Sequence, residues 1–170
     1  SPDKTYGLSK VVLEFLAKMA YEKHQLKSVI YRPFSGYGMD QATSYPFSNL
    51  LKLVREAHSD SIEVWGSGKQ VRDFLYIKDF IDGIFYFMDK IDNSDIVNLG
   101  TGIGTSFEEL VTKMCSIVHP TRKFEIKARI EQPEGCFYRV ADITKMNSMG
   151  FYPKYNLEEG IKDSIKLLEY

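Results

Sequence analysis

The sequence Ser28-Val29-Ile30-Tyr31 is a short apolar run, rich in β-branched residues, that stops at Pro33. It indicates a buried strand, because such runs fill parallel sheets and a proline cannot continue the ladder of backbone hydrogen bonds. The segment that follows, residues 35–44, is rich in glycine and polar residues and is predicted to be a loop. Binding sites of α/β proteins lie in loops that follow the ends of strands. This stretch therefore predicts a strand that leads directly into a site.

Helices are predicted on both sides of this strand. Residues 4–25 place apolar side chains at helical spacing with polar side chains between them, which indicates a long amphipathic helix. Residues 46–57 indicate a helix that lies on a core, and residues 78–91 indicate a strongly apolar helix that is well buried. The alternation of helices and strands favours an α/β fold. Because no strand is followed by a glycine-rich phosphate turn, we expect the second part of a larger protein.

Shorter apolar stretches predict further strands. Residues 62–65 and 71–77 flank the glycine-containing segment 66–70, and we expect them to form a pair of strands joined by that turn. Residues 96–99 and 124–130 are also predicted to be strands.

Capping residues indicate where the remaining helices begin. Ser106 and Glu109 are spaced as a capping box, in which each side chain accepts a hydrogen bond from the other residue's backbone N–H. A short helix is predicted over residues 143–149, and Asn156 is expected to cap a final helix that reaches Tyr170.

The composition excludes several classes of protein. The 170 residues are 44% hydrophobic and 26% charged, which suits one compact domain or a large piece of one rather than a disordered or fibrous chain. The net charge of -1 provides no field to attract nucleic acid or an anionic membrane, so neither is expected as a partner. No apolar run approaches the roughly 20 residues that a membrane-spanning helix needs.

The two cysteines, Cys115 and Cys136, lie far apart and have no histidine at a ligand-like spacing. We therefore expect neither a disulfide framework nor a metal site. Such cysteine usage suits a reducing compartment, and residues 1–4 lack the character of a signal peptide. A cytoplasmic location is the resulting expectation.

Tyr6 and Lys10 are four residues apart, so on a helix their side chains lie one above the other on the same face. A phenol is a poor base at neutral pH, but a nearby ammonium favours the phenolate. Such a pair could exchange a proton with a sugar hydroxyl or a ketone. The alternative is an exposed pair without a role in chemistry.

Several segments resemble, in order and spacing, the extended short-chain dehydrogenase/reductase superfamily, specifically its NAD-dependent nucleotide-sugar epimerases and dehydratases. The three clearest are Tyr6-Gly7-Leu8-Ser9-Lys10, residues 31–38 and residues 71–79. They resemble the family's Tyr-x-x-x-Lys, Arg-Pro-x-Asn-x-Tyr-Gly and Arg-Asp-x-x-x-Val-x-Asp segments. Weaker similarity extends over nearly the whole chain.

The resemblance implies an α/β fold that is the C-terminal part of a Rossmann-like doubly wound parallel sheet, plus a small α/β substrate-binding subdomain. Residues 1–40 would form the catalytic Tyr/Lys helix and the next strand of the Rossmann-like domain. Residues 41–170 would form mainly the substrate-binding subdomain, with residues 71–100 returning to the Rossmann-like domain.

The resemblance also implies which residues meet NAD or NADP. Tyr6 would be the general acid and base, and Lys10 would favour its phenolate while holding the nicotinamide ribose. Pro33 would follow the end of a strand beside the nicotinamide, next to Arg32. A simple strand stop is an equally compatible interpretation of Pro33.

Substrate contacts follow from the same resemblance. Arg72 would bind the diphosphate of a nucleotide diphosphate sugar, a role that suits a forked, permanently charged donor. Its alternatives are an exposed charge or a pair with Asp73 or Asp79. Ser35 stands where the family often has asparagine, and Arg139 is the basic candidate because the family's arginine-rich stretch is not matched here.

The segment Gly100-x-Gly102-x-Gly104 is expected to be a structural turn, since its third glycine comes too soon for a phosphate-binding loop. The chain would then lack the dinucleotide-binding half of its family. We therefore expect the C-terminal portion of an NAD(P)-dependent isomerase, lyase or oxidoreductase of nucleotide sugars, in which tyrosine-mediated proton transfer accompanies hydride transfer at a sugar carbon. Such a protein would form a homodimer at full length, through a face over residues 8–19 that could equally be a core face. The alternative is a catalytically silent fragment that binds a nucleotide sugar or another subunit.

Overall fold

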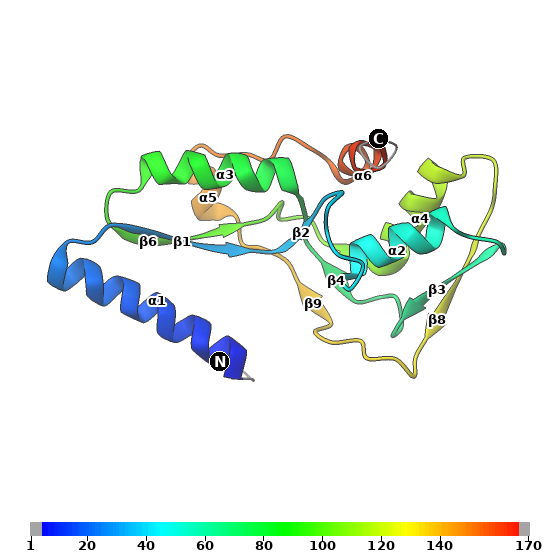
Figure 1. The fold of residues 1–170 in the computed structure, drawn as a ribbon, viewed down its shortest axis with the longest axis horizontal. Helices are drawn as coiled ribbons and strands as arrows, with labels where there is room; N and C mark the ends of the chain where they lie inside the picture. Colours follow the sequence, from blue (N-terminus) through cyan, green and yellow to red (C-terminus); the bar gives the residue numbers. More distant parts are fainter. Residues whose placement is uncertain (1–4, 167–170) are drawn as a thin grey trace.

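The computed structural model describes residues 5–166, which fold into helices and mostly parallel strands (Figure 1). The helices are α1 (Thr5–His24), α2 (Pro46–Arg55), α3 (Ile77–Lys90), α4 (Phe107–Val118), α5 (Thr144–Ser148) and α6 (Leu157–Lys166). The strands are β1 (Ser28–Pro33), β2 (Ser35–Tyr37), β3 (Ser61–Trp65), β4 (Val71–Arg72), β5 (Phe74–Tyr76), β6 (Ser94–Leu99), β7 (Thr105–Ser106), β8 (Glu125–Arg129) and β9 (Tyr138–Arg139). Two clusters of buried apolar side chains divide these elements into two lobes. None of the described helices is both long and apolar enough to cross a membrane.

The first lobe is built on the parallel pair β1 and β6, whose register runs from Ser28 opposite Ser94 to Pro33 opposite Leu99. Helices α1 and α3 lie on opposite faces of this pair (Figure 1). The predicted strand is confirmed, but its apolar residues are half-buried rather than buried. The reason is that, among the described strands, only β6 pairs with β1 and the sheet is narrow.

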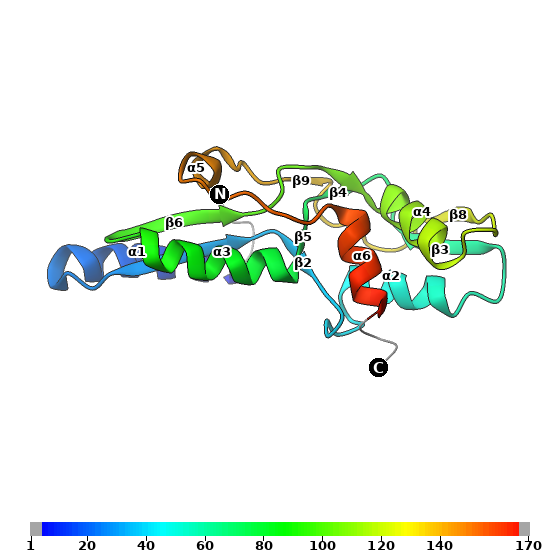
Figure 2. The same cartoon turned by 90° about the horizontal axis from the view of Figure 1, so that it is seen from above.

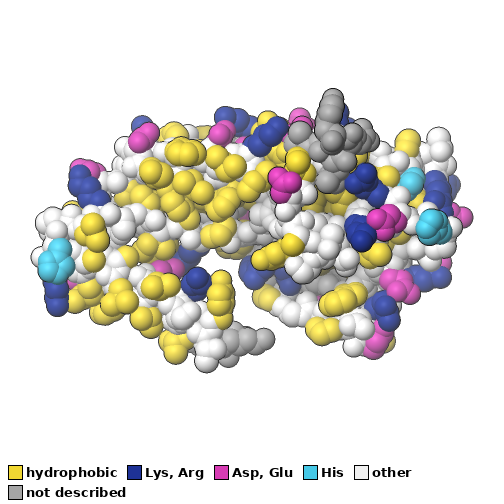
Figure 3. Space-filling view, in the orientation of Figure 1, with side chains coloured by type: hydrophobic (Ala, Val, Ile, Leu, Met, Phe, Trp, Pro, Cys, Tyr) yellow, Lys and Arg dark blue, Asp and Glu magenta, His cyan; other side chains and the backbone are white. Residues whose placement is uncertain are grey.

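Helix α3 forms where the sequence predicts it, but the expectation that it is well buried is wrong. Phe87 is buried in the core of the first lobe, whereas Ile81, Phe85 and Met88 are exposed. One face of the helix packs on β1, and hydrophobic side chains gather on the outer surface over α3 (Figure 3).

The second lobe packs α2 and α4 against the parallel pair β3 and β8 (Figure 2). Val54 of α2, Val64 of β3 and Leu110 of α4 meet in its core, all essentially inaccessible to solvent. Helix α6 packs against α4, as the apolar periodicity of both helices requires. These elements confirm the predicted helix after residue 46 and the predicted strands at 62–65 and 124–130.

The predicted pair of strands at 62–65 and 71–77 is wrong. β3 pairs with β8, β4 pairs with β7 and β9, and β5 pairs with the short strand β2, which lies in the predicted loop. Backbone groups of residues 68–72 are hydrogen-bonded to residues 105–108 and 137–139 instead. Apolar patterning predicts that strands lie on a core, but it does not specify which distant strand becomes the partner.

The predicted caps are confirmed. Ser106 and Glu109 form a complete capping box at the start of α4, and Asn156 accepts the N–H of Glu159 at the start of α6. The short helix α5 also forms within its predicted range. The predicted end of the final helix at Tyr170 lies outside the described residues.

Replacing Ser106 with Ala should lower the free energy of unfolding by about 1 kcal/mol, because the Glu109 N–H loses its acceptor. Hydrogen bonds from the backbone N–H and the hydroxyl of Ser106 lower the pKa of the Glu109 carboxyl. The carboxylate therefore stabilises the fold above the unfolded pKa of about 4.3, and this contribution is lost as the pH falls through the lowered value. Urea unfolding at neutral and acidic pH measures both effects.

Ser116→Ala is the matched control, since the Ser116 hydroxyl lies on the same helix and donates only to the Lys113 carbonyl oxygen. It should change the free energy of unfolding by less than about 0.5 kcal/mol. Equal losses in the two variants would show that the capping box contributes nothing specific.

Candidate substrate-binding site

A pocket of about 270 Å³ in the second lobe contains both arginines that the sequence analysis assigned to substrate. Arg72 on β4 and Arg139 on β9 stand directly opposite each other in the register of these parallel strands. The exposed rings of Tyr45 and Trp65 also line the pocket. Residues 67 positions apart in sequence are thus brought to one cavity.

Arg72 is almost fully buried, with 9% of its surface exposed. Its Nη1 donates to the Val71 carbonyl oxygen at 2.8 Å, and its guanidinium lies 5.7 Å from the centroid of the Phe107 ring. Burial, and then the positive charge of Arg139, lower the pKa of Arg72. Two carboxylates also line the pocket, but Glu63 pairs with Arg129 and Glu134 accepts hydrogen bonds from Ser67. The two guanidinium groups therefore favour a further anion between them.

The alternative interpretations of Arg72 are wrong. It is not an exposed charge, and it pairs with neither Asp73 nor Asp79. The Asp73 carboxylate accepts hydrogen bonds from Thr101 and other neutral donors, and the Asp79 carboxylate accepts the N–H groups of Lys154 and Tyr155.

Gln70 is a site residue that the sequence analysis missed. Its side chain lines the same pocket with 4% of the residue exposed, and its Nε2 donates to the Trp65 carbonyl oxygen at 2.7 Å. That bond fixes the orientation of the amide, so Oε1 is an acceptor, and it has no hydrogen-bond partner among the described residues. A buried acceptor without a donor is costly unless a ligand supplies one. Its place two residues before Arg72 was the available signal, but one glutamine in a predicted turn is not distinctive.

Tyr6 and Lys10 lie together on α1, as predicted. The Lys10 Nζ is 5.1 Å from the centroid of the Tyr6 ring. Tyr6 is 72% exposed, and neither residue lines the arginine pocket. An open hollow separates the N-terminal end of α1 from the second lobe (Figure 3). The structure therefore brings Tyr6 to Lys10, but does not bring this pair into contact with Arg72.

The other predicted residues lie at the end of the first strand. The Arg32 guanidinium forms a forked pair with Glu14 of α1, with Nε–Oε1 and Nη2–Oε2 distances of 2.7 and 2.5 Å. This pair raises the pKa of Arg32 and lowers the pKa of Glu14. Pro33 ends β1, while Ser35 lies on β2 and does not line the arginine pocket. The assignments of these three residues remain predictions.

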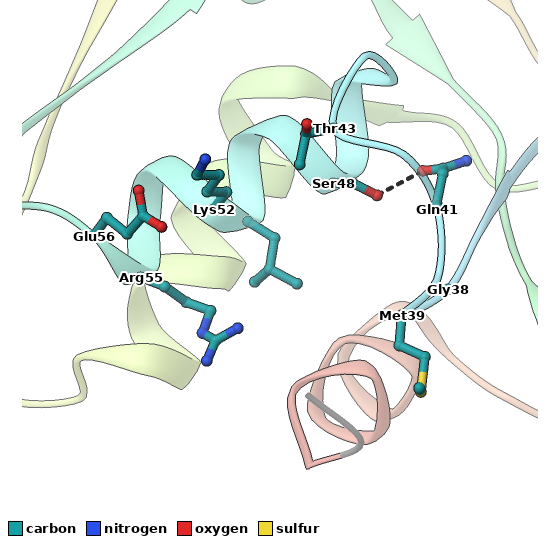
Figure 4. A pocket seen from close by; sticks show the side chains of 9 residues that line it. Gly38, Met39, Gln41, Thr43, Ser48, Lys52, Arg55 and Glu56 are labelled. Carbon is teal, nitrogen blue, oxygen red and sulfur yellow. Dashed lines mark hydrogen bonds between the residues drawn. The ribbon is translucent and has the colours of Figure 1, made fainter. Parts of the chain in front are cut away.

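A second pocket, of about 370 Å³, lies on the opposite face of α2 (Figure 4). Ser48 donates to Gln41 there at 3.1 Å, while Lys52 and Arg55 point in different directions (Figure 4). Because these two cations do not converge, the pocket lacks the paired charge of the arginine pocket. Within residues 5–166 there is no cluster of three or more His, Cys, Asp or Glu side chains that could hold a metal ion.

Residues 1–100 match the family model described as "NAD dependent epimerase/dehydratase family". The chain belongs to this family. The match spans α1, the first sheet pair and the segment that carries Arg72. The fold is therefore that of its members over part of their length.

One curated relative and two solved structures are similar to the chain. The UDP-N-acetyl-alpha-D-glucosaminuronate decarboxylase of Bacillus cytotoxicus is 28% identical over 169 residues, which cover 95% of this chain and 52% of that protein. The solved UDP-glucose 4-epimerase of Thermotoga maritima, with UDP-glucose, superposes with a TM-score of 0.87 at 24% identity, covering 99% of this chain and 54% of the epimerase. The UDP-glucuronic acid 4-epimerase of Bacillus cereus, in complex with UDP-glucuronic acid and NAD, superposes with a TM-score of 0.82 at 24% identity, covering 99% and 54%. The chain thus spans about half the length of the relatives it matches.

Proposed function

We propose that the chain forms the catalytic-tyrosine and substrate-binding part of an NAD- or NADP-dependent epimerase or dehydratase that acts on a nucleoside diphosphate sugar. The observation that carries this proposal is the pairing of Arg72 with Arg139 in one pocket. Membership of the family supports it, and two solved relatives hold UDP sugars. Residues 1–40 and 71–100 would belong to the Rossmann-like domain, with Arg72 reaching the substrate, and the rest would form mainly the substrate-binding subdomain.

The diphosphate would lie between the two guanidinium groups, because a forked donor matches the oxygens of a phosphate and carries a permanent charge. Gln70 Oε1 would accept a hydrogen bond from an N–H or O–H group of the same ligand. The rings of Tyr45 and Trp65 would provide apolar surface for the base or the sugar. The pocket thus offers partners for each part of a nucleotide sugar.

The Tyr6 phenolate oxygen would take the proton from a sugar hydroxyl and, as the phenol, later return it. Lys10 would meet the same substrate and cofactor, because its Nζ lies 5.1 Å from the centroid of the Tyr6 ring. A bound nicotinamide would supply the hydride acceptor. Other groups that could hold a dinucleotide are already paired: Arg32 with Glu14, and the N–H groups of Thr101 and Gly102 with Asp73. The described residues would therefore meet only the nicotinamide-ribose end of the cofactor.

Binding of nucleoside diphosphates tests the proposal directly. Titrating the chain calorimetrically with UDP, GDP, ADP and dTDP should reveal micromolar affinity for at least one. The corresponding monophosphate should bind at least about tenfold more weakly, since it engages one guanidinium rather than two. Absence of binding by all four nucleotides, or equal affinity for monophosphate and diphosphate, would contradict the proposed site.

Replacing Gln70 with Met should lower the affinity for that nucleotide by about tenfold, because the pocket loses an acceptor that the ligand can use. Thermal stability should change little, since loss of the hydrogen bond to the Trp65 carbonyl oxygen is offset by removal of a buried acceptor that has no partner among the described residues. Calorimetry and thermal unfolding measure the two quantities.

Gln41→Met provides the contrast, because both polar groups of Gln41 are already hydrogen-bonded, to Gly36 and Ser48. It should lower stability and leave affinity unchanged. If the Gln70 variant loses stability but not affinity, its amide is structural and does not meet the ligand.

A further inference from the structure

Asp73 is a completely buried carboxylate, 0% exposed, between β4 and β5. Its Oδ1 accepts hydrogen bonds from the Thr101 N–H and hydroxyl, at 2.8 and 2.7 Å. Its Oδ2 accepts the N–H groups of Gly102 and Ala141, at 2.9 and 3.2 Å. All these donors are neutral, so one side chain ties together three segments that are distant in sequence.

The glycines of the turn after β6 make this arrangement possible. A Cβ on Gly100 would lie 2.6 Å from Asp73 Oδ2 and 2.5 Å from the Ala141 Cβ. Gly102, whose N–H donates to the carboxylate, has a φ of 73°, which other residues rarely adopt. The turn therefore binds a carboxylate of the chain itself, which explains why it is not a phosphate-binding loop.

The segments that Asp73 joins are the segments that carry the arginines. Asp73 directly follows Arg72, and its N–H donates to the Arg139 carbonyl oxygen at 3.2 Å. Ala141, which donates to the Asp73 side chain, is two residues beyond Arg139. Asp73 thus holds the backbone next to each arginine, through its main chain and through its side chain.

Holding these two backbone segments in place counteracts the repulsion between the arginine side chains. Arg72 and Arg139 carry like charges, and the charge of Arg139 lowers the pKa of Arg72. The charge of Glu134, which also lines the pocket, offsets this repulsion in part, but its carboxylate accepts hydrogen bonds from Ser67 and from neither arginine. The arginine side chains therefore remain close only if the strands beneath them cannot separate. Hydrogen bonds to a carboxylate are stronger than bonds between neutral groups and suit this task.

We propose that Asp73 is a positioning residue that sets the spacing of Arg72 and Arg139 for a diphosphate. This inference rests on the proposed function, because it assumes that the arginine pair binds two linked phosphates. Asp73 itself is inaccessible and touches no ligand. Asp73 would change how strongly the site prefers two linked phosphates over one, because this preference depends on the distance between the guanidinium groups.

The test compares the affinity of the chain for inorganic pyrophosphate with its affinity for orthophosphate. In the wild-type chain pyrophosphate should bind more tightly. Asp73→Asn replaces an acceptor by a donor facing N–H groups and should reduce this preference about tenfold, since an ångström-scale displacement costs that much or more. Orthophosphate, which needs one guanidinium, should bind almost unchanged.

Asp79→Asn is the matched control. Asp79 is equally buried, 1% exposed, and accepts the N–H groups of Lys154 and Tyr155, away from both arginines. It should lower stability as Asp73→Asn does and keep the preference for pyrophosphate. Thr101→Val, which removes only the hydroxyl donor, serves if Asp73→Asn does not fold, and should reduce the preference about threefold.

A preference that survives in the Asp73 and Thr101 variants would overturn the role of Asp73 and leave the arginine site intact. A wild-type chain that shows no preference for pyrophosphate would overturn the diphosphate site, and with it this inference. The two failures are therefore distinguishable in one set of titrations.

Discussion

Replacing Tyr6 with Phe is expected to reduce kcat for conversion of the nucleotide sugar by a factor of about 10² to 10⁴. Phenylalanine preserves the ring beside Lys10 but removes the only atom that can carry the proton. KM should change little, because the arginine pocket that would hold the diphosphate is separate from Tyr6. Steady-state assays with NAD or NADP on the protein that also contains a dinucleotide-binding half, following the product by chromatography, measure both constants.

Tyr21→Phe on the same helix is the control, and it should retain full activity. Tyr6→Phe/Lys10→Met should be little slower than Tyr6→Phe alone, since residues that act as a unit are not additive. Activity near the wild-type level in the Tyr6 variant would exclude it as the acid and base, and would favour a binding role for the chain.

The second large effect is expected from Arg72→Ala, which should weaken binding of the preferred nucleoside diphosphate by about 100-fold. The Arg72 side chain is buried, so water that enters in its place cannot supply an equivalent charged donor. Arg139 is then left as the guanidinium opposite the phosphates. Arg72→Lys keeps the charge but loses the forked pair of donors, so its affinity for the nucleotide should lie between those of the alanine variant and the wild type.

Arg122→Ala tests whether any lost positive charge has the same effect. Arg122 follows α4 and pairs with Asp60, and neither residue lines the arginine pocket. It should change the affinity less than about twofold. Comparable losses in the two alanine variants would mean that the protein attracts the nucleotide by overall charge rather than at the proposed site.

The features that could be predicted from the sequence are those that depend on neighbouring residues. Ser106 and Glu109 interact within one helical turn, and Tyr6 and Lys10 share a helix face, so spacing alone predicted both pairs. The strand at 28–33 was predicted from its composition. Its half-burial was not, because burial depends on what covers the sheet.

The features that could not be predicted depend on distant parts of the chain. Strand β4 pairs with residues 105–106 and 138–139 rather than with its neighbour β3, and no local pattern specifies that choice. Asp73 was considered only as a partner for Arg72, yet its donors lie 28 to 68 residues away. Gln70 was missed for the same reason, since its importance comes from burial and a missing partner.

The forked pair between Arg32 and Glu14 has a mechanical consequence for Tyr6. Helix α1 has no buried residue, so the ion pair and a few contacts with β1 and β6 set its angle to the sheet. Tyr6 lies eight residues, or about 12 Å, beyond Glu14 along the helix axis. A tilt of about 10° at Glu14 therefore moves Tyr6 by about 2 Å, several times the tolerance of about 0.5 Å for a catalytic group. The contact between Glu14 and Arg32, at the end of β1, therefore determines in part where the Tyr6 phenol lies.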